Sequence, residues 1–301
     1  MKKITLILYI TFSYLSIFSQ ETDSLELILN NKNSDTIPTD PKISKLRMYL
    51  TYSSTNSFLG KKDSIAIPLI RPAIKYTHWS GLFTKIALVH TSTTSKAFDE
   101  LDFSLGYQFN IGNHWDGSIS YARFFFSKDV SRITSLVNNN LNAYFAYDFD
   151  WLYSAISFDY SSGSKTYIKA AKKGKNPSKT NSVTTSLKDY TFTLMNSKAF
   201  NSYDVFIEDD KLIISPEVDL YIGTQNNVIV YHKKITTSNT ASSLNLKSAV
   251  VNLDVMYVYK NCIFNLSPYV NFPIIVSEGE TNNPFFVLYG GFYYTLRWQK
   301  K

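Results

Sequence analysis

The 301-residue chain has little charge and only one cysteine, Cys262. Charged residues make up 18% of it, against about 25% in typical soluble domains. Tyr, Phe, Ser, Thr and Asn largely take their place. One cysteine cannot form an internal disulfide, and no stretch reaches the ~18 consecutive apolar residues of a membrane helix. A disulfide scaffold and a helical membrane bundle are therefore excluded.

The net charge of +7 would suit a protein that binds a polyanion. Six of its lysines, however, lie in one segment: Lys165, Lys169, Lys172, Lys173, Lys175 and Lys179. No nucleic-acid-binding motif accompanies that segment, so we expect no nucleic-acid partner. The run is typical of a solvated loop, with lipopolysaccharide phosphates as the alternative partner. Metal-ligand spacings and phosphate-binding loops are also lacking from the sequence, and we expect no cofactor.

The N-terminus has the pattern of an export signal. Met1-Lys2-Lys3 is basic and Ile4 to Phe18 is apolar, which predicts a cleaved signal peptide over residues 1–20. Residues 21–44 are polar and predict a loose periplasmic leader. The even spacing of strand patterns over residues 45–301 predicts a single domain there.

Apolar and polar residues alternate through that domain. The first clear run places six apolar residues on one face: Leu101, Phe103, Leu105, Tyr107, Phe109 and Ile111. A helix cannot place six such residues on one side, so the pattern predicts a β-strand. Twelve strands are expected, near 45–54, 70–79, 82–91, 100–111, 115–126, 139–149, 151–161, 186–197, 212–223, 249–260, 262–275 and 284–298. The segment from Tyr203 to Ile207 could add another, which leaves ten or fourteen strands open.

Short connections alternate with long ones rich in Ser, Thr, Asn and Lys. This alternation is typical of bacterial barrels with short periplasmic turns and long external loops, and it places both termini in the periplasm. Lysine is rare on the predicted polar faces, which favours a membrane barrel over a secreted soluble β-protein. Aromatic residues near strand ends predict interfacial girdles: Trp115, Tyr121, Phe149, Trp151, Tyr160, Tyr257, Tyr259 and Trp298.

The last stretch, Phe285 to Trp298, resembles the closing strand of Gram-negative outer-membrane β-barrels. Trp298 resembles the terminal aromatic read by the barrel-assembly machinery, although Gln299-Lys300-Lys301 follow it. The end of the signal, Phe18-Ser19-Gln20, resembles export signals of the Bacteroidota. The resemblance implies an all-β, antiparallel transmembrane barrel in the outer membrane, surrounded by its lipid and lipopolysaccharide and assembled by that machinery.

Three function classes follow: a narrow channel or small-solute transporter, a structural, adhesive or assembly barrel with a plugged lumen, and a lipid-modifying hydrolase. The third rests on His90-Thr91-Ser92, which resembles the His and Ser of outer-membrane phospholipases. A serine nucleophile needs its base oriented by a third group. No Asn is identifiable in that role, so we do not expect an enzyme.

The predicted inward positions carry charge in two arcs. Basic residues come from the first three strands and the last: Arg47, Arg71, Lys75, Lys85 and Arg297. Acids come from the strands between: Asp102, Asp116, Asp148, Asp159, Asp189, Glu217, Asp219 and Asp254. In an open lumen, opposed charges would orient dipolar or zwitterionic solutes. If they pair instead, they close the lumen, since buried charges are tolerated when paired.

Overall fold

The computed structural model describes residues 43–55, 57–58, 61–62, 67–91, 97–127, 137–169, 181–231, 234–274 and 283–299. The predicted signal peptide and nearly all of the leader lie outside these residues and stay predictions. The described part contains no helix long and apolar enough to cross a membrane. Its strands are β1 (Ile43–Ser53), β2 (Ser57–Phe58), β3 (Lys61–Lys62), β4 (Leu69–Thr77), β5 (Leu82–Thr91), β6 (Glu100–Ile111), β7 (Trp115–Phe126), β8 (Asn139–Asp148), β9 (Tyr153–Lys169), β10 (Asn181–Ser197), β11 (Phe200–Tyr203), β12 (Asp210–Tyr231), β13 (Lys234–Tyr259), β14 (Cys262–Pro273) and β15 (Phe285–Gln299).

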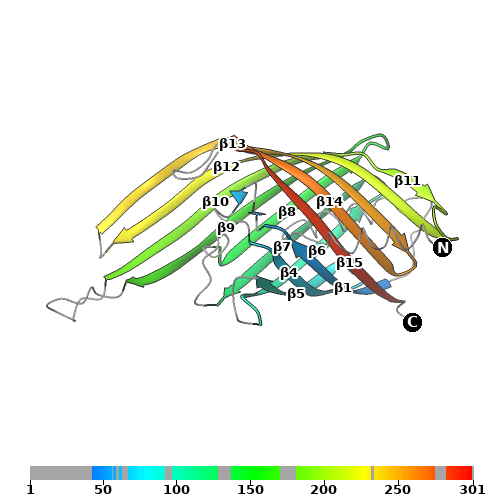
Figure 1. Cartoon of the computed structure of the whole chain (residues 1–301), viewed down its shortest axis with the longest axis horizontal. Coiled ribbons are helices and arrows are strands. Elements are labelled where there is room, and N and C mark those ends of the chain that lie inside the picture. Colours follow the sequence, from blue (N-terminus) through cyan, green and yellow to red (C-terminus); the bar gives the residue numbers. More distant parts are fainter. Residues whose placement is uncertain are drawn as a thin grey trace.

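The main sheet closes on itself (Figure 1). Its strands pair in the order β10-β9-β8-β7-β6-β5-β4-β1-β15-β14-β13-β12-β11, and β10 also pairs with β12. Every pairing is antiparallel, including that of the first strand with the last. The predicted twelve-stranded antiparallel barrel is therefore confirmed. As far as Ser162 of β9 and Ser248 of β13, closure gives every wall strand two neighbours, which satisfies the backbone polar groups there without an open edge.

Strand bounds agree best with the sequence where the apolar alternation is strict. β5, β6 and β7 span the predicted ranges 82–91, 100–111 and 115–126. The predicted ranges were too short for four strands. β9 continues to residue 169 and β12 to residue 231, while β10 begins at residue 181 and β13 at residue 234. These extensions are rich in Thr, Ser and Asn, so they lack the one-sided apolar pattern that predicts a half-buried strand.

The four extended strands project beyond the rest of the wall, as Figure 1 shows at the left. Their pairing continues to the tips, with Asn181 opposite Lys169 and Val183 opposite Tyr231. β8 pairs with β9 only as far as Ser162. Much of the polar sequence that predicted loops at 162–185 and 224–248 is therefore sheet. Of the lysine-rich segment, Lys165 and Lys169 lie on β9, and residues 170–180 are outside the described residues.

The segment predicted as a further strand begins earlier than Tyr203. β11 pairs with residues 211–214 of β12, while β10 leaves the same edge of β12 at Ser197, opposite Glu217. β10 and β11 thus share one edge in succession, so the closed wall has twelve strands. The chain then turns through residues 204–209.

Short turns lie at the end of the barrel where β1 begins and β15 ends. Four non-glycine residues there have positive φ: Asp150, Asp204, Asp209 and Lys260. Gly81 has φ +93°, and a Cβ on it would lie 2.1 Å from the main-chain oxygen of Gln108. Only glycine can make that turn while β5 and β6 remain paired.

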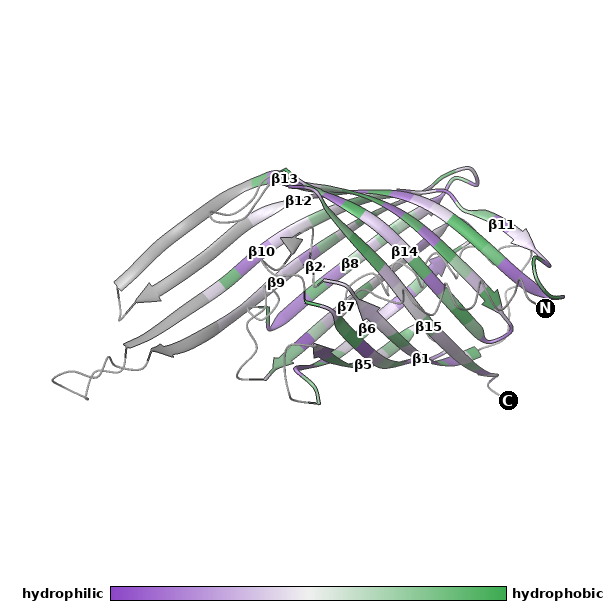
Figure 2. Cartoon of the chain, in the orientation of Figure 1, coloured by the Kyte–Doolittle hydropathy of each residue, from purple (hydrophilic) through white to green (hydrophobic). Residues whose placement is uncertain are grey.

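The two faces of the wall differ in kind, and Figure 2 shows the colours alternating along the strands. Outward residues are apolar and exposed, with 54% of Leu105, 50% of Ile119 and 41% of Leu253 accessible. Inward residues are mostly polar, charged or tyrosine, with some aliphatic side chains among them, and most are buried. An apolar outside around a polar inside is the arrangement of a barrel whose outer wall faces lipid.

Candidate functional site

The inner wall carries a basic arc on three neighbouring strands. Arg47 of β1, Arg71 and Lys75 of β4 and Lys85 of β5 are each at most 8% exposed. Register places them side by side, with Arg47 opposite Lys75 and Lys75 opposite Lys85. Lys75 Nζ lies 4.0 Å from the centre of the Phe83 ring. The aromatic face offsets part of the cost of gathering cations in so small an area.

Acids line the inner wall on the other strands. Seven of the predicted ones are at most 6% exposed: Asp102, Asp116, Asp159, Asp189, Glu217, Asp219 and Asp254. Neutral donors hold two of them. Asn140 and Asn142 donate to Asp159 Oδ1 at 3.2 and 3.1 Å, and the Tyr153 hydroxyl reaches both oxygens of Asp116 at 3.1 Å. Hydrogen bonds of this kind lower the cost of burying a carboxylate.

The basic and acidic arcs meet between β4 and β6. Arg71 Nη2 lies 3.2 Å from Asp102 Oδ2 and 3.9 Å from Glu100 Oε1. All three side chains are at most 5% exposed. The sequence placed Arg71 and Asp102 in separate arcs, and the structure joins them at the boundary. Glu100 was not among the predicted residues, although its even number puts it on the inward face of β6 with Asp102.

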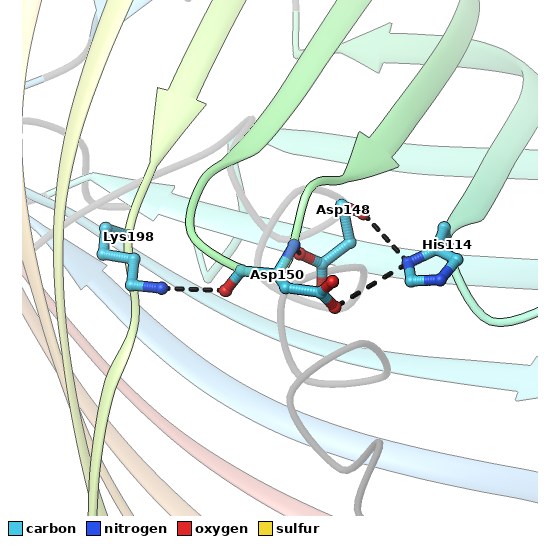
Figure 3. Close-up of polar contacts among 4 residues, drawn as sticks. All are labelled: His114, Asp148, Asp150 and Lys198. Carbon is cyan, nitrogen blue, oxygen red and sulfur yellow. Dashed lines mark hydrogen bonds and ion pairs between the residues drawn. The ribbon is translucent and has the colours of Figure 1, made fainter.

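Asp148 and Arg297 lie at the short-turn end, apart from the rest of the arcs. Figure 3 shows Asp148 in the turn between β8 and β9, where its carboxylate accepts a 2.9 Å hydrogen bond from the Asp150 amide. His114 Nδ1 donates to the Asp148 carbonyl at 3.0 Å, and Lys198 Nζ donates to the Asp150 carbonyl at 2.8 Å. Arg297 is exposed near the end of β15. Asp148 thus supports a turn, and Arg297 sits at the rim.

One side of the lumen is bulky. Tyrosines from β1, β14 and β15 turn inward there and pack with aliphatic side chains: Tyr49, Tyr269, Tyr289 and Tyr293 with Ile213, Met256, Ile263 and Val287. The rings of Tyr49 and Tyr293 are 5.6 Å apart, and the hydroxyls of Tyr289 and Tyr293 are hydrogen-bonded. The sequence analysis did not select this cluster. The tyrosines at odd positions of the last strand, Tyr289 and Tyr293, could have indicated aromatic side chains inside the lumen.

The opposite side of the lumen is lined by small residues. Inward positions of β6 and β7 hold Ser104, Gly106, Ser118, Ser120 and Ala122, and each is partly exposed. β7 and β14 are six strands apart in either direction around the twelve-stranded wall, so they face each other. We call these five residues the small-residue lane. The lumen is thus asymmetric, with tyrosines on one side and small side chains on the other.

The predicted girdle residues lie at two levels of the outer wall. Six are at the short-turn end: Trp115, Phe149, Trp151, Tyr257, Tyr259 and Trp298. The Trp115 ring lies 4.4 Å from that of Tyr147, and Trp298 stacks on Tyr76 at 5.9 Å. Tyr121 and Tyr160 flank Leu141, two residues from the opposite end of β8. Aromatic rings at two levels suit the two interfaces of a membrane.

The hydrolase hypothesis rested on His90 and Ser92. His90 lies on the outward face of β5, as do the other even-numbered residues of that strand. Its Nδ1 has no hydrogen-bond partner in the described part of the chain. Ser92 lies outside the described residues. Among the described residues no group of three or more His, Cys, Asp or Glu side chains could hold a metal ion.

No family model matches the chain, and no curated protein is similar to it in sequence. Similar solved structures include the NanC porin, with 10% identity, a TM-score of 0.41, and 84% of this chain and 100% of that chain covered. An outer membrane channel from Pseudomonas putida F1 has 11% identity and a TM-score of 0.41, covering 87% and 98%. The translocator domain of the autotransporter NalP from Neisseria meningitidis has 9% identity and a TM-score of 0.40, covering 92% and 94%. At these values the likeness carries no argument about function, which therefore depends on the chain's own inner wall.

Proposed function

We propose that the chain forms a narrow channel for small polar solutes across the outer membrane. The observation that carries this proposal is the small-residue lane. Ser104, Ser118 and Ser120 keep part of the inner wall small where it faces the tyrosines of β14 and β15, although the Phe83 ring packs on Gly106 beside them. Eight-stranded barrels are filled by their side chains, whereas sixteen-stranded porins hold an aqueous channel. Twelve strands, two of them carrying small residues on the inner face, leave room for a narrow path.

The charge pattern indicates which solutes this path favours. Cationic side chains gather on β1, β4 and β5, whereas carboxylates outnumber cations on β6, β7, β9, β10, β12 and β13, where Lys211 and Lys247 are also buried. A field directed across the lumen orients molecules that carry a dipole or both signs of charge. Dipolar or zwitterionic solutes are therefore the best match to the wall as a whole.

We propose an orientation that places both termini of the chain in the periplasm. The short turns lie at the same end of the barrel as the start of β1 and the end of β15. In bacterial barrels the short turns are periplasmic and the long loops are external. The extended β9, β10, β12 and β13 then project outward from the cell, where lipopolysaccharide is the surrounding lipid. Trp298 near the end of β15 supports a role for the barrel-assembly machinery in insertion.

The channel is tested by single-channel recording in a planar bilayer with the purified full-length chain. Ser120→Phe would add bulk to the small-residue lane and should lower the conductance. Ile119→Phe places the same ring one position away on the lipid face, so it should leave the conductance unchanged. Arg71→Ala removes a cation from the wall and should shift the ion selectivity toward cations.

A wild-type barrel that conducts no ions would overturn the proposal. It would favour a plugged lumen and a structural, adhesive or assembly role. Equal conductance in Ser120→Phe and the wild type would show that the small-residue lane is not the path.

A further inference from the structure

The inner face of β13 and β14 carries a row of five buried polar residues, and three of them have unmet hydrogen-bonding capacity. The row consists of Ser248, Asn252 and Asp254 of β13 and Asn265 and Ser267 of β14, each at most 3% exposed. We call it the polar ladder. It adjoins the tyrosine cluster and faces the small-residue lane across the lumen.

Three atoms of the ladder lack a hydrogen-bond partner within the described part of the chain. They are Ser248 Oγ, Asn252 Oδ1 and Asn265 Nδ2. Each is shielded from solvent, so bulk water does not replace the missing partner. A buried polar atom without a partner costs about 1–3 kcal/mol, and native proteins rarely leave several together without a role.

The bonding around Ser267 adds to the demand for a ligand. Its hydroxyl lies 2.7 Å from Asn265 Oδ1 and is also in contact with the Asp254 carboxylate. A hydroxyl has one proton and can donate to only one of these oxygens. Asn265 Oδ1 thus already faces a hydroxyl, whereas Asn265 Nδ2 has no acceptor among the described residues.

This mixture of atoms selects the class of ligand. A metal cation would satisfy the acceptors and be repelled by the amide N–H of Asn265. An anion would meet Asp254 and the neighbouring Glu217, which is opposite Asn252. A hydroxyl group both donates and accepts, so it satisfies either end of an Asn side chain. A neutral ligand with many hydroxyls fits all of these groups.

Two tyrosines provide the apolar part of such a site. Tyr269 is opposite Asn252 in register, and Tyr289 is opposite Ser267. Ligand sites commonly combine aromatic surface with a few placed polar groups. Asn252 lies four residues along β13 from the level of Asn265, about 13 Å at ~3.3 Å per residue. That length suits a short chain of sugar rings.

We propose that the polar ladder is a binding subsite for neutral saccharides in transit through the lumen. The inference rests on the proposed channel, because the solute reaches the ladder through the lumen. It also refines that proposal, since it assigns a neutral, polyhydroxylated substrate to one wall of the charged lumen.

The test is isothermal titration of the full-length protein in detergent with maltotriose. Wild-type protein should bind it saturably. The double variant Asn252→Leu with Asn265→Leu should bind about thirtyfold more weakly or not at all, since each of the two lost bonds contributes roughly 1 kcal/mol. Asn142→Leu is the matched control, because Asn142 is on β8 and already donates to Asp159. Heat-modifiable migration on gels establishes that each variant is folded, and Ser248→Ala is a milder second variant.

Several outcomes would overturn the inference. They are no saturable heat with maltotriose, equal affinity in the wild type and the double variant, or binding of Ca²⁺ at the ladder in place of the sugar. The recording experiment is independent of this one. Conductance without saccharide binding would reject the subsite at the polar ladder and support the channel. Saccharide binding without conductance would reject the channel and leave the polar ladder as a binding site.

Discussion

Arg71 of β4 and Asp102 of β6 form a 3.2 Å ion pair although β5 lies between their strands. Asp102 is opposite Ala87 of β5, and Ala87 is opposite Ala73 of β4. The two alanines are at most 6% exposed and leave space for the long arginine side chain to reach the carboxylate. This pair links three consecutive strands on their inner face.

Breaking the pair should destabilise the barrel. Arg71→Ala leaves Asp102 and Glu100 buried without their cation, which costs about 3–5 kcal/mol. The free energy of unfolding in lipid vesicles, from urea titration, measures this loss. Arg71→Met combined with Asp102→Leu removes both charges and should recover most of the stability. A double variant as unstable as Arg71→Ala would contradict this account.

The two faces of β6 should respond differently to charge. Leu105 is 54% exposed on the outer wall, whereas Ser104 faces the lumen. An arginine near the bilayer centre costs about 2–4 kcal/mol on the lipid face, so Leu105→Arg should fold poorly into vesicles. Ser104→Arg should have a smaller effect, because its charge meets a polar lumen. Comparable losses would reverse the assignment of inside and outside.

Two turn glycines offer a matched comparison. Gly81 and Gly112 both have positive φ, of +93° and +64°. A Cβ at Gly81 would collide with Gln108, whereas a Cβ at Gly112 would meet nothing within 4 Å. Gly112→Ala should therefore cost only the backbone strain, about 1–2 kcal/mol, and Gly81→Ala clearly more. Refolding yield and unfolding free energy report both, and similar values would refute the predicted collision.

Asp210 organises the turn that follows β11. Its carboxylate accepts hydrogen bonds from the amides of Val205, Phe206 and Ile207 at 2.6–3.0 Å and from the Tyr257 hydroxyl at 3.0 Å. Bonds to a charged group contribute about 1.5–3 kcal/mol each. Asp210→Ala should therefore lower the unfolding free energy by roughly 3 kcal/mol and expose this turn to protease. Glu208→Ala, at an exposed position of the same turn, is the control and should change neither.

Much of the fold could be read from the sequence because lipid imposes a strict period of two. β6 and β7 have an apolar residue at nearly every outward position, and their ends were predicted to the residue. β13 was predicted from 249 but begins at Lys234. Beyond the lipid both faces of a strand can be polar, so hydrogen-bonded pairing continues there without a sequence pattern to reveal it.

The inner wall was less readable. Charges such as Lys75 and Asp159 stand out at inward positions, and parity alone places them. Whether two charges meet depends on the register across strands. Register brings Arg71 to Asp102, whereas Asp148 is the last residue of β8 and its carboxylate accepts from the Asp150 amide. Asn252 and Asn265 gave no signal, because an amide lacking a partner looks in sequence like any other amide.

The seam between β1 and β15 carries a consequence for assembly. Arg47 Nε donates to Thr295 Oγ1 at 3.2 Å across a separation of 248 residues. Every other wall pairing joins strands that are neighbours or near neighbours in the chain. The loop-closure entropy of such a distant contact must be met before the contact forms. We therefore expect closure of the seam to come late in barrel formation, because until β15 pairs with β1 both edges of the sheet are unpaired.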